Sequence, residues 1–264
     1  MKKAVFIILS FLMVTSTFAK SSLWNIESQN VYLQAQNKVV LGGIIRADIN
    51  NKKLSLTFTG HEFADGAEII MHTLEKNNVN GTFFLTGDFY RKYPLIVKQL
   101  QDKGHYMGPH SDKHLLYADW TKRDSTLVTK DEFVADVENN YIAMTNAGLN
   151  IEMPKYYMPP YEWYNQEVSN WAKELDVQIV NFTPGTTSNA DYTTPAMNNY
   201  RSSEQIYNAI LSFAEKESLN GVIMLIHIGT HPDRTDKLYN KLDSLIKELK
   251  SRGYDFVRID ELLK

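Results

Sequence analysis

The stretch LSLTFTG, residues 54–60, is short and uncharged: Leu54, Leu56 and Phe58 alternate with small hydroxyl residues. The stretches GTFFLT at 81–86 and VIMLIH at 222–227 are equally short and more continuously apolar. Short runs of apolar, aromatic and small uncharged side chains are typical of strands buried on both faces of a parallel sheet. Segment 54–58 is therefore predicted to be a strand in the interior of such a sheet.

Helical patterns separate this strand from others like it. Two of the helices are predicted to begin with a capping box, formed by Thr129 with Glu132 and by Ser202 with Gln205. A third is expected to begin at Thr235. Further helices are expected over 67–77, 89–103 and 165–175, and the strands over 54–58, 82–86, 105–108, 156–159, 178–182, 222–227 and 256–259. Seven strands alternating with helices predict one α/β domain with a closed or nearly closed parallel barrel.

The composition excludes several classes of protein. The 264 residues carry 28 Lys and Arg against 31 Asp and Glu, a net charge of -3, which is unlike the basic excess of a nucleic-acid-binding protein. Hydrophobic residues make up 43%, a value typical of a globular protein. The absence of cysteine excludes disulfides, thiolate zinc sites and a cysteine nucleophile.

The first residues have the pattern of a secretory signal. Lys2 and Lys3 precede the apolar run 4–14, and small residues follow, so we expect cleavage after Ala19. The apolar run is shorter than the roughly 20 residues of a membrane-spanning helix. The mature protein is expected to be periplasmic or secreted. The predicted organisation is a signal peptide at 1–19, a lead-in at 20–40 and a catalytic domain at 41–264.

Polar residues gather where the predicted strands end. In parallel barrels the chemistry lies at the carboxyl ends of the strands. His110 and His114 follow one strand at a spacing of four, which allows two imidazoles to ligate one metal ion. His227 ends the most apolar strand, and an imidazole there is suited to act as a general acid.

These residues resemble the polysaccharide deacetylase family, with its NodB-homology fold, over about residues 40–264. The resemblance is carried by Leu56-Thr57-Phe58 with Gly81-Thr82-Phe83-Phe84, by His110-x-x-x-His114, by Met158-Pro159-Pro160-Tyr161 and by Leu225-Ile226-His227. It implies a distorted (β/α)7 barrel and hydrolysis of N- or O-acetyl groups on a polysaccharide or cell-wall glycan. It also implies a divalent metal bound by one Asp and two His, an Asp as base and a His as acid.

The chain departs from the family pattern at concerted positions. Thr59 and Gly60 stand where the family has two adjacent Asp, which are the base and the third metal ligand. Met158 replaces the Arg that steadies the base, and Thr183 and Thr186 occupy acidic positions near the fifth strand. The active site is therefore either rebuilt or retired.

Other side chains are candidates for rebuilding it. The predicted metal ligands are His110, His114, Asp65 and His61, with zinc as the expected ion and nickel or cobalt as alternatives. The predicted catalytic residues are His227, Glu162 and Glu62, and the predicted substrate-binding residues are Tyr161, Trp163 and Thr183, with Trp120 as a further stacking candidate. Asp112 is expected to orient an imidazole.

Two functions remain open at this point. The first is a metal-dependent deacetylase whose partner is an acetylated polysaccharide or oligosaccharide. The second is a non-catalytic carbohydrate-binding protein that keeps the groove without the chemistry. The missing Asp pair favours the second, whereas the retained His110, His114 and His227 favour the first.

Overall fold

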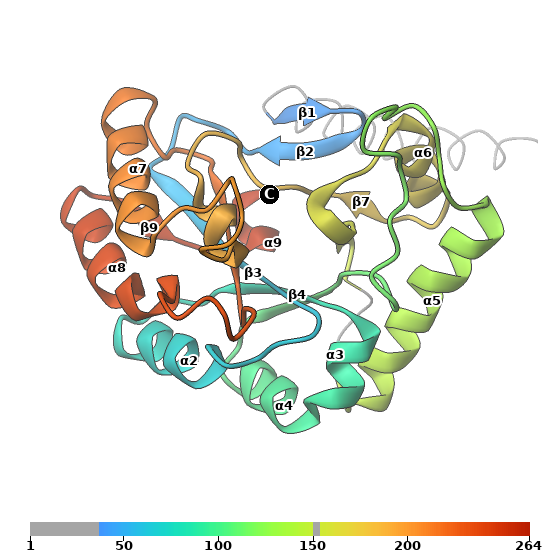
Figure 1. Ribbon diagram of the computed structural model, residues 1–264, viewed down its shortest axis with the longest axis horizontal. Coiled ribbons are helices and arrows are strands. Elements are labelled where there is room, and N and C mark those ends of the chain that lie inside the picture. The colour runs from blue at the N-terminus through green and yellow to red at the C-terminus, as the bar shows by residue number, and fades with distance from the viewer. Residues whose placement is uncertain (1–36, 150–153) are drawn as a thin grey trace, which may run out of the picture. The chain divides into compact units, whose positions relative to one another are not determined.

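The computed structural model describes residues 37–149 and 154–264, which belong to one α/β unit (Figure 1). The predicted signal peptide, and the lead-in as far as residue 36, lie outside the described residues. Among the described residues, none of the helices is both long enough and apolar enough to cross a membrane.

The main sheet is parallel and has β3 (Lys53–Gly60) in its middle. β3 pairs with β4 (Thr82–Leu85) on one side and with β8 (Ile223–His227) on the other. β5 (Tyr106–Pro109) extends the sheet beyond β4, and the short β9 (Asp255–Phe256) pairs with the start of β3. From Leu54 to Gly60 every residue of β3 is buried, as expected for a strand covered on both faces.

Two smaller groups of strands complete the barrel. β6 (Tyr156–Tyr157) and β7 (Gln178–Ile179) form a parallel pair, and β1 (Lys38–Val40) and β2 (Gly43–Arg46) form an antiparallel hairpin. Isolated bridges join β2 to Val180 and to Val222, so the hairpin spans the gap between β7 and β8. Each of the seven predicted strands overlaps an observed one, but β6, β7 and β9 are only two residues long and α9 begins at Ile259, inside the predicted strand 256–259. The barrel is distorted because its strands fall into separate sheets.

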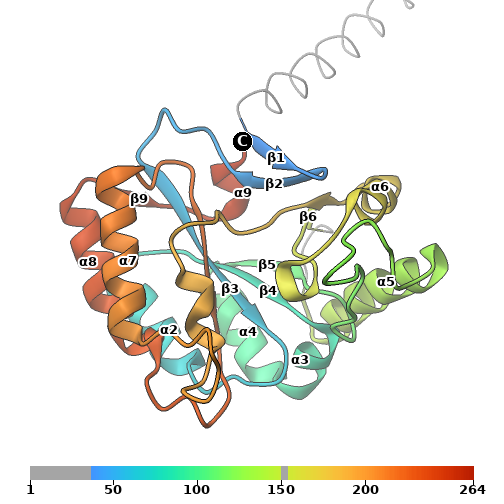
Figure 2. The same ribbon diagram turned by 45° about the horizontal axis from the view of Figure 1, so that its top comes forward.

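Helices flank the sheet on both sides. α7 (Ser203–Lys216) and α8 (Leu242–Ser251) lie on one side of β3, and α5 (Lys130–Asn146) and α6 (Gln166–Glu174) lie on the other (Figure 2). The remaining helical elements are α2 (Ala67–Lys76), α3 (Gly87–Lys92), α4 (Pro94–Asp102) and α9 (Ile259–Leu262), with short 3-10 turns η1 (Pro160–Glu162), η2 (Ser188–Tyr192) and η3 (Leu238–Lys241).

The start signals of the helices are partly as predicted. Both capping boxes, at Thr129 and at Ser202, are present. The predicted helix 89–103 is instead two helices, because Pro94 cannot continue α3 and begins α4. The expected start at Thr235 is wrong, since the chain first forms η3 and α8 begins only at Leu242.

The core occupies both faces of the sheet. Phe58 stacks on Phe83 with their ring centroids 4.8 Å apart, within the cluster between the sheet and its helices. The adjacent residue Phe84 belongs to a second buried cluster with Met158 and Leu225. Consecutive residues of β4 therefore fill opposite faces, as the two-residue period of a strand requires.

We predict that Leu56→Ala lowers the free energy of unfolding by about 2–5 kcal/mol, because Leu56 is fully buried and the truncation leaves a cavity. Urea unfolding followed by circular dichroism measures this difference. Leu95→Ala is the matched control, since Leu95 is 78% exposed, and should change the same free energy by less than about 0.5 kcal/mol. Equal effects of the two substitutions would contradict the assignment of β3 to the core.

Candidate functional site

The carboxyl ends of the main strands meet at one edge of the sheet. Thr59 of β3 is in register with His227 of β8 and with Phe84 of β4, and Leu85 is in register with Pro109 of β5. The residues that follow these ends are His61 after β3 and His110 after β5. The structure thus brings three of the predicted site histidines together, from segments that are far apart in the sequence.

A cleft of about 840 Å³ lies over this edge. Its residues fall into a polar group and an apolar wall. The polar group includes His61, Glu62, His110, His114, Glu162 and His227, and the apolar wall includes Val40, Ile45, Phe63, Trp120, Tyr161, Trp163, Phe182, Tyr192 and Met197. Of the predicted substrate-binding residues, Tyr161 and Trp163 lie in this cleft.

His110 is held by a hydrogen bond that fixes its tautomer. Its Nδ1 lies 2.8 Å from the carbonyl oxygen of Met158, and because a carbonyl only accepts, Nδ1 carries the proton. The other nitrogen, Nε2, is thereby an acceptor and lies 4.0 Å from Oε1 of Glu162. Burial lowers the pKa of His110 to about 3, so the ring is neutral at pH 7.

His114 sits in a strained loop. Its φ is 57° and that of Ser111 is 72°, both in the left-handed region that non-glycine residues rarely adopt. The backbone N–H of His114 donates to Oγ of Ser111 at 2.8 Å. Burial, together with the neighbouring imidazoles, lowers the pKa of His114 to about 2. Its ring stacks on that of His61, with centroids 4.6 Å apart and planes 8° from parallel.

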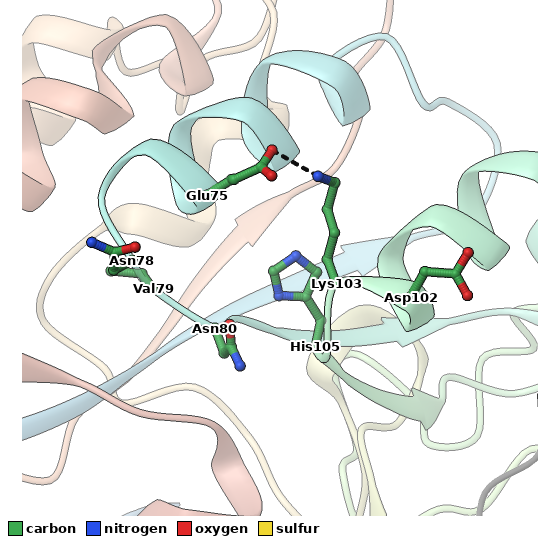
Figure 3. A pocket seen from close by; sticks show the side chains of 7 residues that line it. All are labelled: Glu75, Asn78, Val79, Asn80, Asp102, Lys103 and His105. Carbon is green, nitrogen blue, oxygen red and sulfur yellow. Dashed lines mark hydrogen bonds and ion pairs between the residues drawn. The ribbon is translucent and has the colours of Figure 1, made fainter.

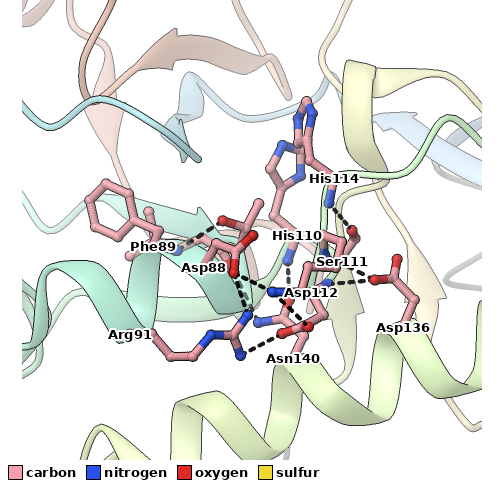
Figure 4. Close-up of polar contacts among 12 residues, drawn as sticks. Asp88, Phe89, Arg91, His110, Ser111, Asp112, His114, Asp136 and Asn140 are labelled. Atoms are coloured by element: carbon pink, nitrogen blue, oxygen red, sulfur yellow. Dashed lines mark hydrogen bonds and ion pairs between the residues drawn. The ribbon is translucent and has the colours of Figure 1, made fainter.

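The helix α5 holds this loop from below (Figure 4). Asn140 accepts a hydrogen bond from the backbone N–H of His110 at 2.8 Å. Asp136 accepts from the backbone N–H groups of Asp112 and Lys113, each at 3.0 Å. Both acceptors are buried, so the loop is anchored by hydrogen bonds shielded from water.

Asp112 does not orient an imidazole, contrary to expectation. Its Oδ1 forms an ion pair with Arg91 at 2.7 Å, on the side of α3. A Cβ at Gly87 would lie 1.8 Å from that same oxygen, so a larger residue at position 87 would displace the Asp112 side chain from this place. The role of Asp112 is thus to tie the histidine loop to the start of α3.

Glu162 is aimed into the cleft by a strained turn. It and Tyr161 have consecutive positive φ values of 53° and 58° within η1. The Glu162 side chain is only 12% exposed. Burial raises the pKa of its carboxyl to about 7, with smaller opposing effects from His227, which lowers it, and Asp191, which raises it. Backbone strain of this kind clusters at functional sites.

His227 is paired with a carboxylate that the sequence did not reveal. Its Nδ1 lies 2.6 Å from Oδ1 of Asp191, and its backbone N–H donates to Oδ2 at 2.9 Å. Burial by itself would lower the pKa of His227, but the charge and hydrogen bond of Asp191 outweigh burial and raise it. The loss of acidic residues near β7 is therefore compensated, because η2 supplies Asp191 five residues after Thr186.

The two positions of the missing Asp pair line the cleft but are tightly packed. Thr59 is 2% exposed and its Oγ1 has no hydrogen-bond partner among the described residues. A Cβ at Gly60 would lie 2.7 Å from side-chain carbons of Ile228 and of Leu85, so an Asp there would require repacking. Met158, where the resemblance implies Arg, is fully buried in the apolar cluster with Phe84.

Two predicted site residues, Asp65 and Thr183, make structural contacts and do not line the cleft. Asp65 accepts hydrogen bonds from Tyr239 at 2.7 Å and from the backbone of Thr230 at 2.8 Å, and pairs with Lys237 at 2.7 Å. These contacts occupy its carboxylate outside the cleft lining. Thr183 is 4% exposed and donates to the carbonyl of Ile45, so it joins strands rather than contacting a substrate. Both expectations are corrected by these placements.

The histidines and carboxylates of the cleft do not provide the three ligands of a complete metal site. The described residues contain no group of three or more His, Asp or Glu placed to hold a metal ion. The lone pairs of an imidazole lie in its ring plane, and the nearly parallel planes of His61 and His114 cannot meet at one ion. His110 and His114, whose rings are 5.0 Å apart and nearly perpendicular, remain as two donors without a third.

A second, smaller cavity of about 320 Å³ lies at the opposite ends of β4 and β5 (Figure 3). Lys103 and Glu75 form an ion pair of 2.7 Å across it. His105 lies beneath this pair, and its Nδ1 accepts a hydrogen bond from the backbone N–H of Gly81. This cavity is remote from the strand ends that carry the candidate site.

The parallel barrel, with a histidine-lined cleft at the carboxyl ends of its strands, has the arrangement of an α/β-barrel enzyme. The chain belongs to the polysaccharide deacetylase family, whose model matches residues 46–180. The predicted family, fold and enzyme class are confirmed by this match.

Individual proteins that are similar to the chain in sequence or in structure belong to the same family of carbohydrate esterases. The chain is 27% identical over 215 residues to a peptidoglycan-N-acetylmuramic acid deacetylase of Bacillus subtilis, covering 80% of this chain and 72% of that protein. A crystallised peptidoglycan N-acetylglucosamine deacetylase superposes with a TM-score of 0.68 at 24% identity, covering 83% and 91%. A CE4 family pseudoenzyme of Bacillus anthracis superposes with the same TM-score at 21% identity, covering 86% and 70%.

We predict that Asp191→Asn lowers the pKa of His227 below 6.5, because burial then acts without the opposing carboxylate. An NMR titration of the His227 ring measures it. Asp233→Asn is the control, since Asp233 is exposed at the cleft, pairs with His231 at 3.5 Å and should leave the pKa of His227 unchanged. An unshifted pKa in Asp191→Asn would contradict the pairing.

Proposed function

We propose that the chain is a hydrolase that removes acetyl groups from an N- or O-acetylated cell-wall glycan outside the cytoplasm. The observation that carries the proposal is that one cleft is lined by both a buried carboxyl, Glu162, and an imidazole paired with a carboxylate, His227. Two of the proteins named above support the substrate class, because they are peptidoglycan deacetylases.

In this proposal Glu162 replaces the missing aspartate base. Its carboxylate takes a proton from water while the water oxygen bonds to the acetyl carbonyl carbon. His227, protonated, gives its proton to the sugar nitrogen or oxygen as the bond from that atom to the acetyl carbon breaks. The products are acetate and the free amine or hydroxyl, and both groups return to their starting states by exchange with solvent.

The two pKa values suit these roles. The pKa of Glu162 is raised to about 7, so a large fraction of this side chain is ionised and able to accept a proton near neutrality. The pKa of His227 is raised above 6.5, so its protonated form persists to higher pH. The rate should therefore rise as Glu162 ionises and fall at higher pH as His227 loses its proton, giving a bell-shaped profile.

We further propose that a divalent metal ion binds to His110 and His114. His110 and His114 are neutral, partly preorganised donors of the kind that zinc, nickel or cobalt prefer. Bound there, such an ion would polarise the acetyl carbonyl. Because the third donor is missing, we propose that binding is weak, and the acid–base roles of Glu162 and His227 do not depend on it.

The alternative is a carbohydrate-binding protein without activity. It is favoured by the lack of a carboxylate at Thr59 and Gly60, which line the cleft, and by the existence of a pseudoenzyme with the same fold. The strained turn at Glu162 argues against it, since a groove that only binds has no need to bury a carboxyl in the same cleft as an imidazole paired with a carboxylate.

We predict that Glu162→Gln reduces acetate release by about 10²–10⁴-fold, because glutamine cannot accept the proton. Initial rates on acetylated chitooligosaccharides and on peptidoglycan fragments measure this. Glu62→Gln is the matched control: Glu62 also lines the cleft but is exposed, so the rate should change less than about threefold.

The two variants separate the possible outcomes. A large loss in Glu62→Gln with an active Glu162→Gln would move the base to Glu62. An inactive parent protein on every acetylated glycan, with intact glycan binding, would support the binding-only alternative.

We predict that zinc binds weakly and that His110→Ala and His114→Ala abolish the binding, since each removes one of two donors. Isothermal titration calorimetry at pH 7.5 measures it, and the affinity should fall only at strongly acidic pH because both pKa values are lowered. His231→Ala, at the exposed rim of the cleft, is the control. Unchanged zinc binding in both variants would place the ion elsewhere.

A further inference from the structure

The proposed acetyl hydrolysis does not use the one cation of the cleft wall. Among the described residues that line the cleft, Arg123 is the only arginine and no lysine occurs. Its guanidinium carbon lies 3.9 Å from the ring centroid of Trp163, a close stacking distance. Its Nε donates to the backbone carbonyl of Tyr164 at 2.8 Å. The guanidinium is thus held by Trp163, which stacks on its face, and by the Tyr164 carbonyl, which binds its Nε edge.

Its outer edge is free. Within residues 37–149 and 154–264, neither Nη1 nor Nη2 of Arg123 has a hydrogen-bond or ion-pair partner. The three cleft carboxylates, Glu62, Glu162 and Asp233, make no ion pair with it. A guanidinium that is fixed in orientation and has both Nη groups free is preorganised for a bidentate contact with a carboxylate.

A continuous row of aromatic rings connects this guanidinium to His114, one of the two proposed metal ligands. His114 is 4.4 Å from Tyr161, Tyr161 is 5.7 Å from Trp120, and Trp120 is 5.4 Å from Trp163, measured between ring centroids. Trp120 is 54% exposed and Tyr161 is 45% exposed, so these rings are open to the cleft. Exposed aromatic faces of this kind can stack on the apolar faces of sugar rings.

Resting on the proposed function, we propose that Arg123 and this aromatic row form a subsite for a sugar that carries a carboxylate. The aromatic rings hold the sugar faces, and Arg123 binds the carboxylate with its Nη groups. The preferred substrate is then an acidic acetylated glycan rather than a neutral one. The carboxylate has two possible sources, the lactyl ether of a muramic sugar and the uronate of an acidic polysaccharide.

Binding is tested first, because it does not require turnover. Isothermal titration calorimetry with the full Glu162→Gln protein compares an N-acetylmuramic acid oligosaccharide, its carboxyl methyl ester, an N-acetylated uronate-containing oligosaccharide and a neutral chitooligosaccharide of equal length. At least one of the two acidic oligosaccharides should bind about 10- to 100-fold more tightly than the neutral one. Comparing the muramic with the uronate oligosaccharide then shows which kind of carboxylate the subsite recognises.

Substitution of Arg123 supplies the second comparison. Arg123→Gln in the same background should remove the preference for the acid and leave binding of the neutral oligosaccharide within about twofold. Arg123→Lys should retain only part of the preference for the acidic oligosaccharide, since an ammonium cannot make the bidentate contact. Lys122→Gln is the matched control, because Lys122 is the adjacent exposed cation outside the cleft lining. Equal thermal melting of all variants excludes unfolding.

Turnover by the Glu162-containing protein separates this inference from the proposed function. Arg123→Gln should lower kcat/KM for the acidic glycan through KM, with kcat nearly unchanged. Arg123-dependent binding without acetate release would uphold the subsite and overturn the proposed hydrolysis. Acetate release that is equal on acidic and neutral glycans, and insensitive to Arg123→Gln, would overturn the subsite and uphold the hydrolysis.

Discussion

The parallel pairing of β3 with β4 and β8 is the constraint on which the site depends. Because parallel strands run in the same direction, the residues after their carboxyl ends share one edge of the sheet. The register aligns Thr59 with His227 and Leu85 with Pro109, so His61, His110 and His227 reach the same cleft. β3 is buried on both faces, with Leu54, Leu56 and Phe58 on one and Ser55, Thr57 and Thr59 on the other, and this burial maintains that register.

The burial that stabilises the barrel also sets the charges of the site. Removal from water disfavours the charged form of any group, so it raises the pKa of Glu162 and lowers those of His110 and His114. His227 escapes this trend because Asp191 lies 2.6 Å from its Nδ1. One physical effect thus yields two neutral imidazoles and a carboxyl that ionises near neutrality, and a single ion pair keeps the third imidazole protonatable.

The divergence from the family pattern is a coordinated change. An Asp at Gly60 would displace the neighbouring side chains of Ile228 and Leu85, and Met158 fills the interior where the resemblance implies an Arg. In their place the loop after β6 turns through two left-handed residues, Tyr161 and Glu162, and directs a new carboxyl into the cleft. The same turn exposes Tyr161 in the aromatic row that leads to Arg123.

The amino-acid sequence by itself determined the seven strands, the two capping boxes and the histidines His110, His114 and His227, because these depend on local patterns of apolar and polar residues. It could not decide which carboxylates belong to the site. Asp65, close in sequence to the missing pair, is bound to Lys237, whereas Asp191 pairs with His227 across 36 positions. Only the tertiary structure brings such distant residues into contact, and only their burial there decides which of them is charged.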